Sequence, residues 1–255
     1  MNHTHSPPPE GVANFQPTHW TLVLAAAQSR APGASSALAR LCQLYWYPLY
    51  AFARRRGHVP EDAQDLTQGF FLQLLEHRLL AAADQRKGKF RSFLLAAFQH
   101  YLSDQADRAR CLKRGGRYEF ISLDLENAED RYQREPAGTD LTAEQLFDAR
   151  WAIVLLGRAK TLLGQEYEVQ GRAAIFDALK PFLEGGAPTP SYEAAANALG
   201  MGLATTKTLI HRLRKRYTAI LRQEIARTVS DPGEVGAEIH ALCGALIASE
   251  GRLEP

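Results

Sequence analysis

The sequence predicts an all-α fold made of two helical domains joined by an acidic linker, the second domain containing a helix–turn–helix. Three observations predict it. Apolar residues recur at helical spacing almost throughout, and no segment alternates apolar and polar residues as a half-buried strand does. An acidic, proline-containing stretch divides the chain near its middle. Two basic stretches lie on either side of that divide.

Composition limits the classes of protein that need to be considered. The 255 residues are 45% hydrophobic and 23% charged, as is typical of a soluble globular chain, and the net charge is only +2. The three cysteines, Cys42, Cys111 and Cys243, have neither metal-ligand spacing nor a disulfide framework, which fits a reducing compartment. No apolar run has the length of a signal core or a membrane span. We therefore expect a cytoplasmic protein with no membrane partner.

The first half of the chain predicts four helices. Residues 1–16 are polar and proline-rich and are expected to be disordered, and a first helix is expected over 19–28. A longer one over 35–56 is interrupted near Pro48 and stopped by Gly57. Pro60 opens a helix that ends near Glu76, and another runs over 90–113. Residues 17–116 form the first predicted domain.

The second half begins after a change in composition. Residues 118–148 hold nine acidic and two basic residues, and we assign 117–140 as the acidic linker. Helical periodicity continues over 141–163 and 169–183, and 141–229 form the second domain. The tail, 230–255, predicts one short helix with an apolar side, which is expected to pack back on its own domain. The alternative is a regulatory flap that covers the recognition helix or docks a partner. The apolar side consists of Val235, Ile239, Leu242 and Leu246.

A helix–turn–helix is predicted at 192–216. A short helix over 192–200 ends at a glycine, 201–203 form the turn, and a second helix follows over 204–216. On a helical wheel Leu209, Ile210, Leu213 and Tyr217 face inward, as does Thr206. The remaining sides carry short polar groups and long cations, as a DNA-reading helix requires. These residues are Thr205, Lys207, Thr208, His211, Arg212, Arg214 and Lys215.

The charge distribution favours a polyanionic partner. Residues 86–117 hold nine basic and two acidic residues, and residues 205–227 hold seven basic and one acidic. Either run alone is more simply explained as a solvated helix face. Two such runs, one of them within a helix–turn–helix, indicate two contacts with nucleic acid.

The helix over 60–76 has a second surface of interest. One stripe, Ala63, Leu66, Phe70 and Leu74, is apolar and is expected to face the core. Another stripe mixes acids, an amide and an exposed leucine, which suits a protein-docking face. Its members are Glu61, Asp65, Gln68 and Leu72. In the helix over 90–108, Phe93 and Phe98 lie among aliphatic residues and are expected in the core rather than against bases.

Three segments together resemble a known family. The string Glu61-Asp-Ala-Gln-Asp-Leu-Thr-Gln-Gly-Phe70 resembles the core-binding helix of sigma-70 family factors, especially the extracytoplasmic-function (ECF) subfamily. Residues 90–108 resemble its promoter-melting helix, and 192–217 its DNA-binding helix–turn–helix. The resemblance covers about 17–228, with the segments in the expected order and spacing.

The resemblance implies a transcription initiation factor whose partners are core RNA polymerase and promoter DNA. It implies a region 2-like domain at 17–116 and a region 4-like domain at 141–229, and it leaves open whether an anti-sigma factor or other regulator exists. Core-polymerase contacts fall on Glu61, Asp62, Asp65, Gln68 and Leu72. Contacts near the −10 element fall on His100, Asp104, Arg108, Arg110, Lys113 and Arg114. Contacts with the −35 element fall on Thr205, Lys207, Thr208, His211, Arg212, Arg214 and Lys215.

The chain departs from the family pattern at five positions. A tryptophan is common where Phe93 stands, an Ala-Arg-Asn run is common where Phe98, Gln99 and His100 stand, and an apolar residue is usual at Thr206. Most of these departures concern the −10 contacts, so promoter melting is where unusual specificity is expected.

Other functions explain less of the sequence. A free-standing helix–turn–helix regulator acting without polymerase accounts for 192–217 but not for the face that carries Asp65 and Gln68. An interaction protein that has lost promoter activity has support only from the substituted −10 positions. The sequence predicts no enzyme, no cofactor, no metal site and no catalytic residue, because it holds no glycine-rich phosphate loop, clustered metal ligands or nucleophile motif. The acidic linker is expected to keep the domains apart by mimicking nucleic acid.

Overall fold

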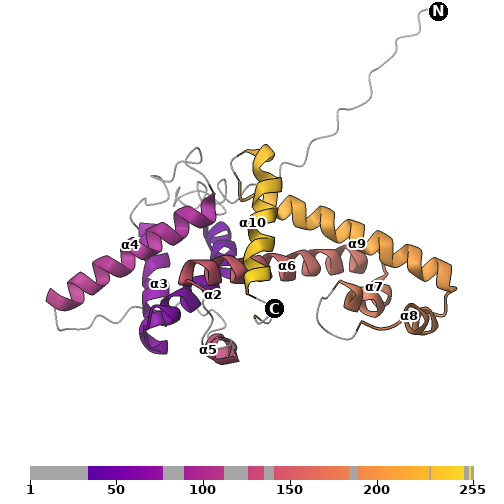
Figure 1. The fold of residues 1–255 in the computed structure, drawn as a ribbon, viewed down its shortest axis with the longest axis horizontal. Coiled ribbons are helices and arrows are strands. Elements are labelled where there is room, and N and C mark those ends of the chain that lie inside the picture. Colours follow the sequence, from indigo (N-terminus) through magenta and orange to yellow (C-terminus); the bar gives the residue numbers. More distant parts are fainter. Residues whose placement is uncertain are drawn as a thin grey trace, which may run out of the picture.

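The computed structural model describes residues 34–76, 89–111, 126–134, 141–183, 189–229, 231–249 and 253. Within these ranges every regular element is a helix and no residue lies in a strand, which confirms the all-α prediction for them (Figure 1). The predicted disordered segment 1–16 and the helix over 19–28 lie outside these ranges. The α-helices are α2 (Ala34–Arg55), α3 (Pro60–Glu76), α4 (Phe90–Cys111), α5 (Glu126–Arg134), α6 (Ala143–Val169), α7 (Ala173–Leu179), α8 (Tyr192–Leu199), α9 (Leu203–Ala226) and α10 (Val235–Ala248). Two short 3-10 turns are η2 (Lys180–Phe182) and η3 (Pro232–Glu234).

The first three helices begin and end close to the predicted positions, with one difference at Pro48. Helix α2 runs through this proline without a break, whereas an interruption was predicted there. A proline inside a helix loses one backbone hydrogen bond, but here the residues around it are buried in the core. Tyr45, Leu49 and Tyr50 are each at most 2% exposed, so packing holds the helix across the lost bond.

Helix α5 lies inside the segment predicted as an acidic linker. Its Glu129 carboxylate accepts hydrogen bonds from Arg54 of α2, with Nε–Oε2 at 2.9 Å and Nη2–Oε1 at 2.8 Å, and from the Tyr50 hydroxyl. The Arg54 guanidinium also lies over the Tyr132 ring, 4.9 Å from its centroid. At least this part of the segment is therefore a docked helix and not a free linker. The remaining linker residues, 117–125 and 135–140, lie outside the described ranges.

Helix α6 extends past the end predicted near Leu163, so the break before the next helix lies at residues 170–172 and not at 164–168. The predicted break, between Leu163 and Val169, contains Gly164, but the helix ends only beyond Val169, where Gly171 adopts a left-handed φ of 67°. Gly164 does not end the helix but provides space for a neighbouring side chain. A Cβ at this position would come 3.0 Å from Cε1 of Phe176, so the glycine lets α7 pack closely against α6. At its start, Thr142 and Gln145 form a reciprocal capping box.

The first of two main cores is built largely from aromatic residues. Tyr45 of α2 stacks on Trp151 of α6 with ring centroids 6.0 Å apart, and meets the edge of Phe90 of α4 at 5.5 Å. Phe70 of α3 and Phe98 of α4 meet at 5.0 Å. The buried Phe98 and half-buried Phe93 both pack into this cluster, so their predicted core position is confirmed. We call this cluster the first core.

The second core lies at the other end of α6. It contains Ala159, Leu163, Leu179, Phe182, Ala195, Ile210, Leu213 and Ile220. The first core instead takes Phe147, Trp151 and Leu155 from α6, and also Ile225 and Val229 from the end of α9 and beyond it. These two main cores meet within α6, between Leu155 and Ala159, and a smaller buried cluster on the same helix joins Leu146, Ala149 and Ile153 to Leu253. The predicted division into two domains at 117–140 is not confirmed, because the first core draws residues from both sides of it.

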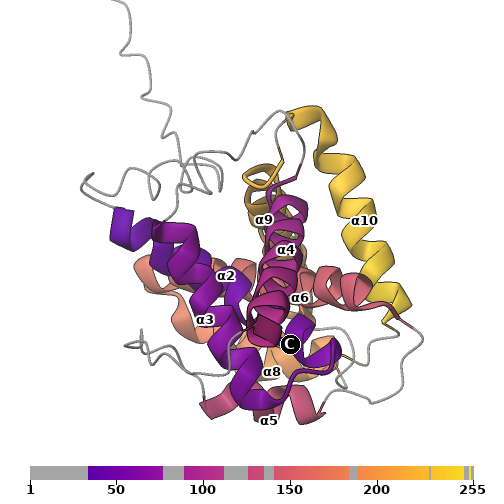
Figure 2. The ribbon, with the colours of Figure 1, turned by 90° about the vertical axis from the view of Figure 1, so that its left-hand side faces the viewer.

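The tail helix α10 packs through its predicted apolar side against α6 and α9, but the first core that it joins also contains residues of the predicted first domain. Val235 and Leu242 are buried there, and Ile239 and Leu246 pack against the same cluster. Figures 1 and 2 show α10 crossing α6 instead of running beside it. The alternative of a flap over the recognition helix is not seen in the described residues, because α10 lies at the opposite end of α9 from the turn that follows α8 (Figure 1).

Four charged side chains join α4, α6 and α10, and we call them the charge cluster: Lys89, Arg91, Asp148 and Glu238. The Glu238 side chain is fully buried, and its Oε1 lies 2.7 Å from Arg91 Nε. Lys89 Nζ lies 2.5 Å from Glu238 Oε2, and Arg91 also pairs with Asp148. Burial by itself raises the pKa of the Glu238 carboxyl, but the hydrogen bonds and charges of Arg91 and Lys89 outweigh it and hold the pKa below its ordinary 4.5.

No helix within the described ranges combines the length and the apolar character that crossing a membrane would require.

Replacing Trp151 tests whether α6 joins the two cores. We expect Trp151→Ala to lower the free energy of unfolding by about 3–5 kcal/mol, because it leaves a large cavity beside Tyr45. Since α6 belongs to both cores, α3 and α9 are expected to lose structure in the same urea transition. Circular dichroism and hydrogen exchange of the two helices measure this. The control is Val169→Ala, at a side chain that is 90% exposed, with an effect within about 0.5 kcal/mol. Separate transitions for α3 and α9 would contradict the shared helix.

Replacing Glu238 tests the charge cluster through its pH dependence. Because the pKa of Glu238 is lower in the folded chain, its stabilisation is present above the ordinary value of 4.5 and is lost as the pH falls through the folded value. We expect Glu238→Gln to destabilise the protein by about 3–5 kcal/mol at neutral pH, since it leaves buried cations unpaired. The difference from wild type should shrink in acid. Urea unfolding across the acid range measures it, and a difference independent of pH would show that the carboxylate charge is unimportant.

Candidate nucleic-acid and protein-binding surfaces

Helices α8 and α9 are joined by a three-residue turn, and local sequence explains each boundary. Ser191 caps the start of α8, where its hydroxyl accepts a hydrogen bond from the Ala194 backbone N–H at 3.0 Å. Gly200 ends α8 with a left-handed φ of 62°, a conformation that costs glycine little. Gly202 then precedes the first turn of α9. The turn, 200–202, lies one residue before the predicted 201–203, and α9 continues past the predicted second helix, 204–216, to Ala226.

The inward face of α9 is the one predicted. Ile210 and Leu213 are buried, and Leu209 and Tyr217 pack partly buried against the second core. The Tyr217 hydroxyl donates to the Leu156 carbonyl of α6 at 3.1 Å, and burial raises its pKa to about 12. Thr206 also points inward and is fully buried, and its hydroxyl donates to the Gly202 carbonyl at 3.2 Å. The hydroxyl is thus satisfied within the helix. An apolar residue is usual at this position in the sigma-70 family, which this segment resembles.

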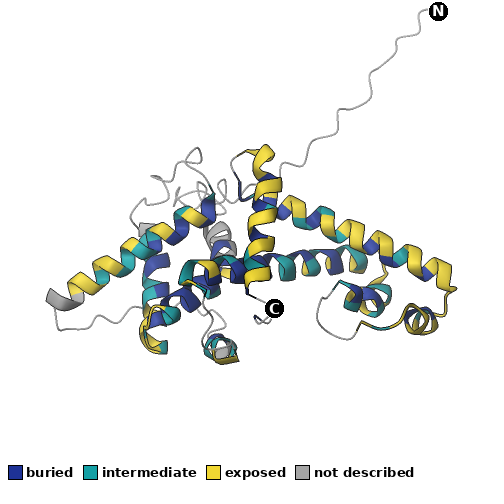
Figure 3. Ribbon diagram, in the orientation of Figure 1, coloured by how far each residue is buried: buried dark blue, intermediate teal, exposed yellow. Residues whose placement is uncertain are grey.

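All seven candidate residues for the −35 element are exposed on α9: Thr205, Lys207, Thr208, His211, Arg212, Arg214 and Lys215. Figure 3 shows exposed positions along the length of this helix. The helix carries no acidic residue before Glu224, which is buried and paired with Arg158 of α6. Arg216 pairs with Glu166, whereas Arg212 and Lys215 form no ion pair with any described residue. The outward face is therefore cationic without a neutralising partner among these residues.

Two of the candidate cations are held by residues that sequence reasoning missed. Arg214 Nε donates to the Phe182 carbonyl of η2 at 3.1 Å. Lys207 lies over the Tyr192 ring, 5.7 Å from its centroid, and that ring stacks on Phe182 at 5.4 Å. Phe182 lies in η2 and Tyr192 opens α8, so the helical spacing within α9 could not predict either contact. Arg214 is thus a positioning residue that ties α9 to η2, and its side chain is less free than those of Arg212 and Lys215.

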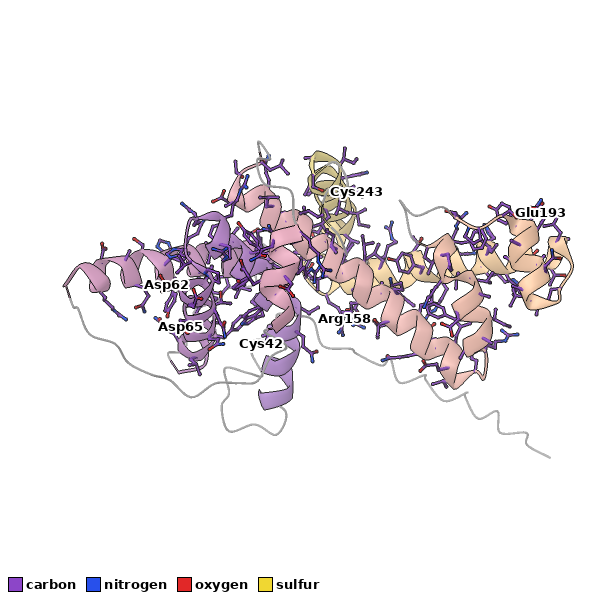
Figure 4. All side chains as sticks on the ribbon, turned by 90° about the horizontal axis from the view of Figure 1, so that it is seen from below. Cys42, Asp62, Asp65, Arg158, Glu193 and Cys243 are labelled. Atoms are coloured by element: carbon purple, nitrogen blue, oxygen red, sulfur yellow. The ribbon has the colours of Figure 1, made fainter. Side chains whose placement is uncertain are left out.

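The acidic part of the candidate docking face on α3 is open to solvent, whereas the amide nitrogen of Gln68 is buried. Glu61, Asp62 and Asp65 are exposed, and Gln68 and Leu72 are half-buried. In Figure 4 Asp62 and Asp65 lie on the same helix near one end of the molecule, far from Glu193 of α8. Beside this face, α3 packs against α4 at Gly69, four residues after Asp65, where a Cβ would come 2.4 Å from the Tyr101 hydroxyl. Glycine therefore lets α4 approach α3 closely, while the acidic side remains uncovered by any described element.

The candidate −10 residues lie on α4 and are only partly described. His100, Asp104 and Arg108 are exposed and recur at intervals of four, so they share one face. The side chain of Arg110, and the residues Lys113 and Arg114, lie outside what the structure describes. Gln99, one of the departures from the family pattern, instead donates from Nε2 to Glu144 Oε1 of α6 at 2.8 Å. It therefore joins two helices and is not free to contact a ligand.

The structure does not gather the candidate residues into one site. The outer end of α4 and the turn between α8 and α9 lie at opposite ends of the longest axis (Figure 1). Among the described residues no group of three His, Cys, Asp or Glu side chains could hold a metal ion. What the arrangement offers is a set of separate contact surfaces: a cationic one on α9, an acidic one on α3 and a mixed one on α4.

Comparison of the chain with models of protein families, with curated proteins and with solved structures finds no match in any of the three.

The tether at Arg214 can be separated from the free cation beside it. We expect Arg214→Ala to lower the free energy of unfolding by about 1 kcal/mol, because the Phe182 carbonyl loses its charged donor. Lys215→Ala, which removes an exposed cation with no described partner, should change it by less than about 0.5 kcal/mol. Urea unfolding of the two variants decides the question, and equal effects would show that the Arg214 contact does not hold α9 to η2.

Proposed function

We propose that this protein is a bacterial transcription initiation factor that binds core RNA polymerase and directs it to promoters with a −10 and a −35 element. The observation that carries the proposal is the division of faces on α9. The seven candidate −35 residues are exposed, while Thr206, Ile210 and Leu213 between them are buried. In the proposed helix–turn–helix, α8 packs against α9 and leaves this cationic face free for DNA.

The chemistry of the α9 face suits a DNA groove. Thr205, Thr208 and His211 are short or planar polar groups that can reach base edges. Lys207, Arg212 and Lys215 supply charge for the phosphates, whose condensed counterions are released when such cations bind. We assign Arg214 mainly to orientation of the helix, because its Nε is already bound to the Phe182 carbonyl.

The acidic face of α3 supports the polymerase part of the proposal. Asp65 and Gln68 lie three residues apart on one side of the helix, with Glu61 and Asp62 one turn earlier. An acidic face is a poor surface for DNA and a good one for a basic protein surface. A factor that binds DNA at α9 and a protein at α3 is what promoter recognition by a multi-subunit polymerase requires. The exposed stripe His100, Asp104 and Arg108 on α4 is proposed to contact the −10 element.

The decisive experiment is binding of the purified chain to bacterial core RNA polymerase. We expect wild type to bind and Asp65→Ala/Gln68→Ala to lose most of that binding, because the variant removes a charge and an amide from the centre of the docking face. The matched control is Gln165→Ala/Glu168→Ala, which removes an exposed amide and acid with the same spacing from the end of α6. Affinity is measured by pull-down and by fluorescence anisotropy of labelled factor.

The result separates the proposal from its main alternative. Absence of binding to core RNA polymerase by folded wild type, or an equal loss of affinity in the control variant, would contradict the proposed polymerase function. DNA binding by the free protein would then favour a helix–turn–helix regulator that acts alone. In that case Lys215→Ala should weaken DNA binding and reduce the dependence of log affinity on log salt by roughly one unit.

A further inference from the structure

We propose that helix α10 is a brace that fixes the distance between the two DNA-contacting ends of the molecule, and so sets the number of base pairs that the protein accepts between its two promoter elements. The part about base pairs rests on the function proposed above. The part about distance concerns the fold alone and can be tested without polymerase.

The brace acts where the elements that carry both ends converge. The Phe90 backbone N–H, at the first residue of α4, donates to the Thr228 carbonyl just after α9 at 3.3 Å. Helix α10 packs on α6 and α9 at this place, and Leu242 enters the first core. The root of α4, the end of α9 and α10 therefore meet in one place, while the outer ends of α4 and α9 point in opposite directions (Figure 1).

The charge cluster makes this junction specific in geometry. Glu238 is fully buried and binds Arg91 twice, with Oε1 2.7 Å from Nε and Oε2 3.3 Å from Nη2. The same guanidinium pairs with Asp148 of α6 and lies over the Trp151 ring, 5.6 Å from its centroid. Apolar side chains could pack here in several slightly different orientations. A carboxylate held by a planar guanidinium and the Lys89 ammonium is satisfied in only one of them.

A fixed distance has a direct consequence on DNA. Successive base pairs lie about 3.4 Å apart along the duplex and are rotated by about 35°, so one extra pair moves and turns the second element relative to the first. Two domains on a flexible linker can follow that change at little cost. Two ends joined by a continuous α6 and braced by α10 cannot follow it, and the DNA must be twisted instead. We therefore expect a narrow choice of spacer length.

Spin labels at the two ends test the brace. Ser103→Cys on α4 and Asn197→Cys on α8 are both exposed positions outside the candidate contact residues. The labels are placed in a chain with Cys111→Ser and Cys243→Ser, and Cys42 can stay because burial makes it inaccessible and raises its pKa to about 12. Electron spin resonance should give one narrow distance distribution in wild type and a broader one in Glu238→Gln.

Two further variants keep this test interpretable. Glu234→Gln removes an exposed acid one turn earlier and should leave the distribution narrow. If Glu238→Gln does not fold, as judged by circular dichroism, Lys89→Met takes its place. It removes the outer, partly exposed cation and keeps the Arg91 pair, so it should broaden the distribution to a smaller extent. A broad wild-type distribution, or a narrow one in every folded charge-cluster variant, would overturn the brace.

The effect on spacer choice is measured with holoenzyme. Promoters selected from random DNA by wild-type holoenzyme are resynthesised with spacers one and two base pairs shorter or longer. We expect wild type to lose transcription by about tenfold or more on the altered spacers. Glu238→Gln should lose less on the altered spacers, and Glu234→Gln should match wild type. Broad distances with an unchanged spacer preference would overturn the inference about spacing. A wild type that binds no polymerase would remove the proposed function together with the spacing, and the label distances alone would then decide the brace.

Discussion

The constraint on which the described structure depends is that one helix, α6, must be buried in two different cores. Its 27 residues span about 40 Å and carry Phe147, Trp151, Leu155, Ala159 and Leu163, each four positions after the last. Four residues turn a helix by about 40° more than one full turn, so the buried stripe rotates by about 160° from Phe147 to Leu163. The first and second cores can therefore lie on different sides of a single helix. No hinge is needed between them.

Much of the fold follows from patterns that are local in sequence. Pro60 with its acidic neighbours fixes the start of α3, and the apolar stripe from Val235 to Leu246 fixes the buried side of α10. The differences arise where a distant partner decides. In the sequence Gly164 resembles a helix stop, but in the fold it lies inside α6 and lets Phe176 pack closely. The helix ends before Gly171, which adopts a left-handed φ. Helix α5 has few apolar residues, so its pattern could not show that Glu129 would bind Arg54 and Tyr50 of α2.

For the candidate surfaces, too, local sequence patterns predict some features and contacts between elements decide the others. A helical wheel correctly separates the buried face of α9, with Ile210 and Leu213, from the exposed face, because that separation depends only on residue spacing. It could not show that Phe182 and Tyr192 hold Arg214 and Lys207, since these contacts depend on how η2 and α8 pack against α9. Nor could it assign Gln99 to Glu144. Spacing predicts which side chains face outward, whereas tertiary contacts decide which of them are free to bind.

The charges show why a net charge of +2 does not argue against nucleic acid. Several acids of the middle segment are paired within the fold: Glu129 with Arg54, Glu144 with Arg56, and Asp148 with Arg91. Each of these carboxylates neutralises a cation near the end of α2 or at the root of α4. On α9, by contrast, Arg212 and Lys215 have no such partner among the described residues. Screening leaves an exposed charge effective over about 8–10 Å, so a duplex at the outer end of α9 would meet its local field and not the sum over the chain. Because these acids are paired elsewhere in the fold, they do not neutralise the exposed cations of α9.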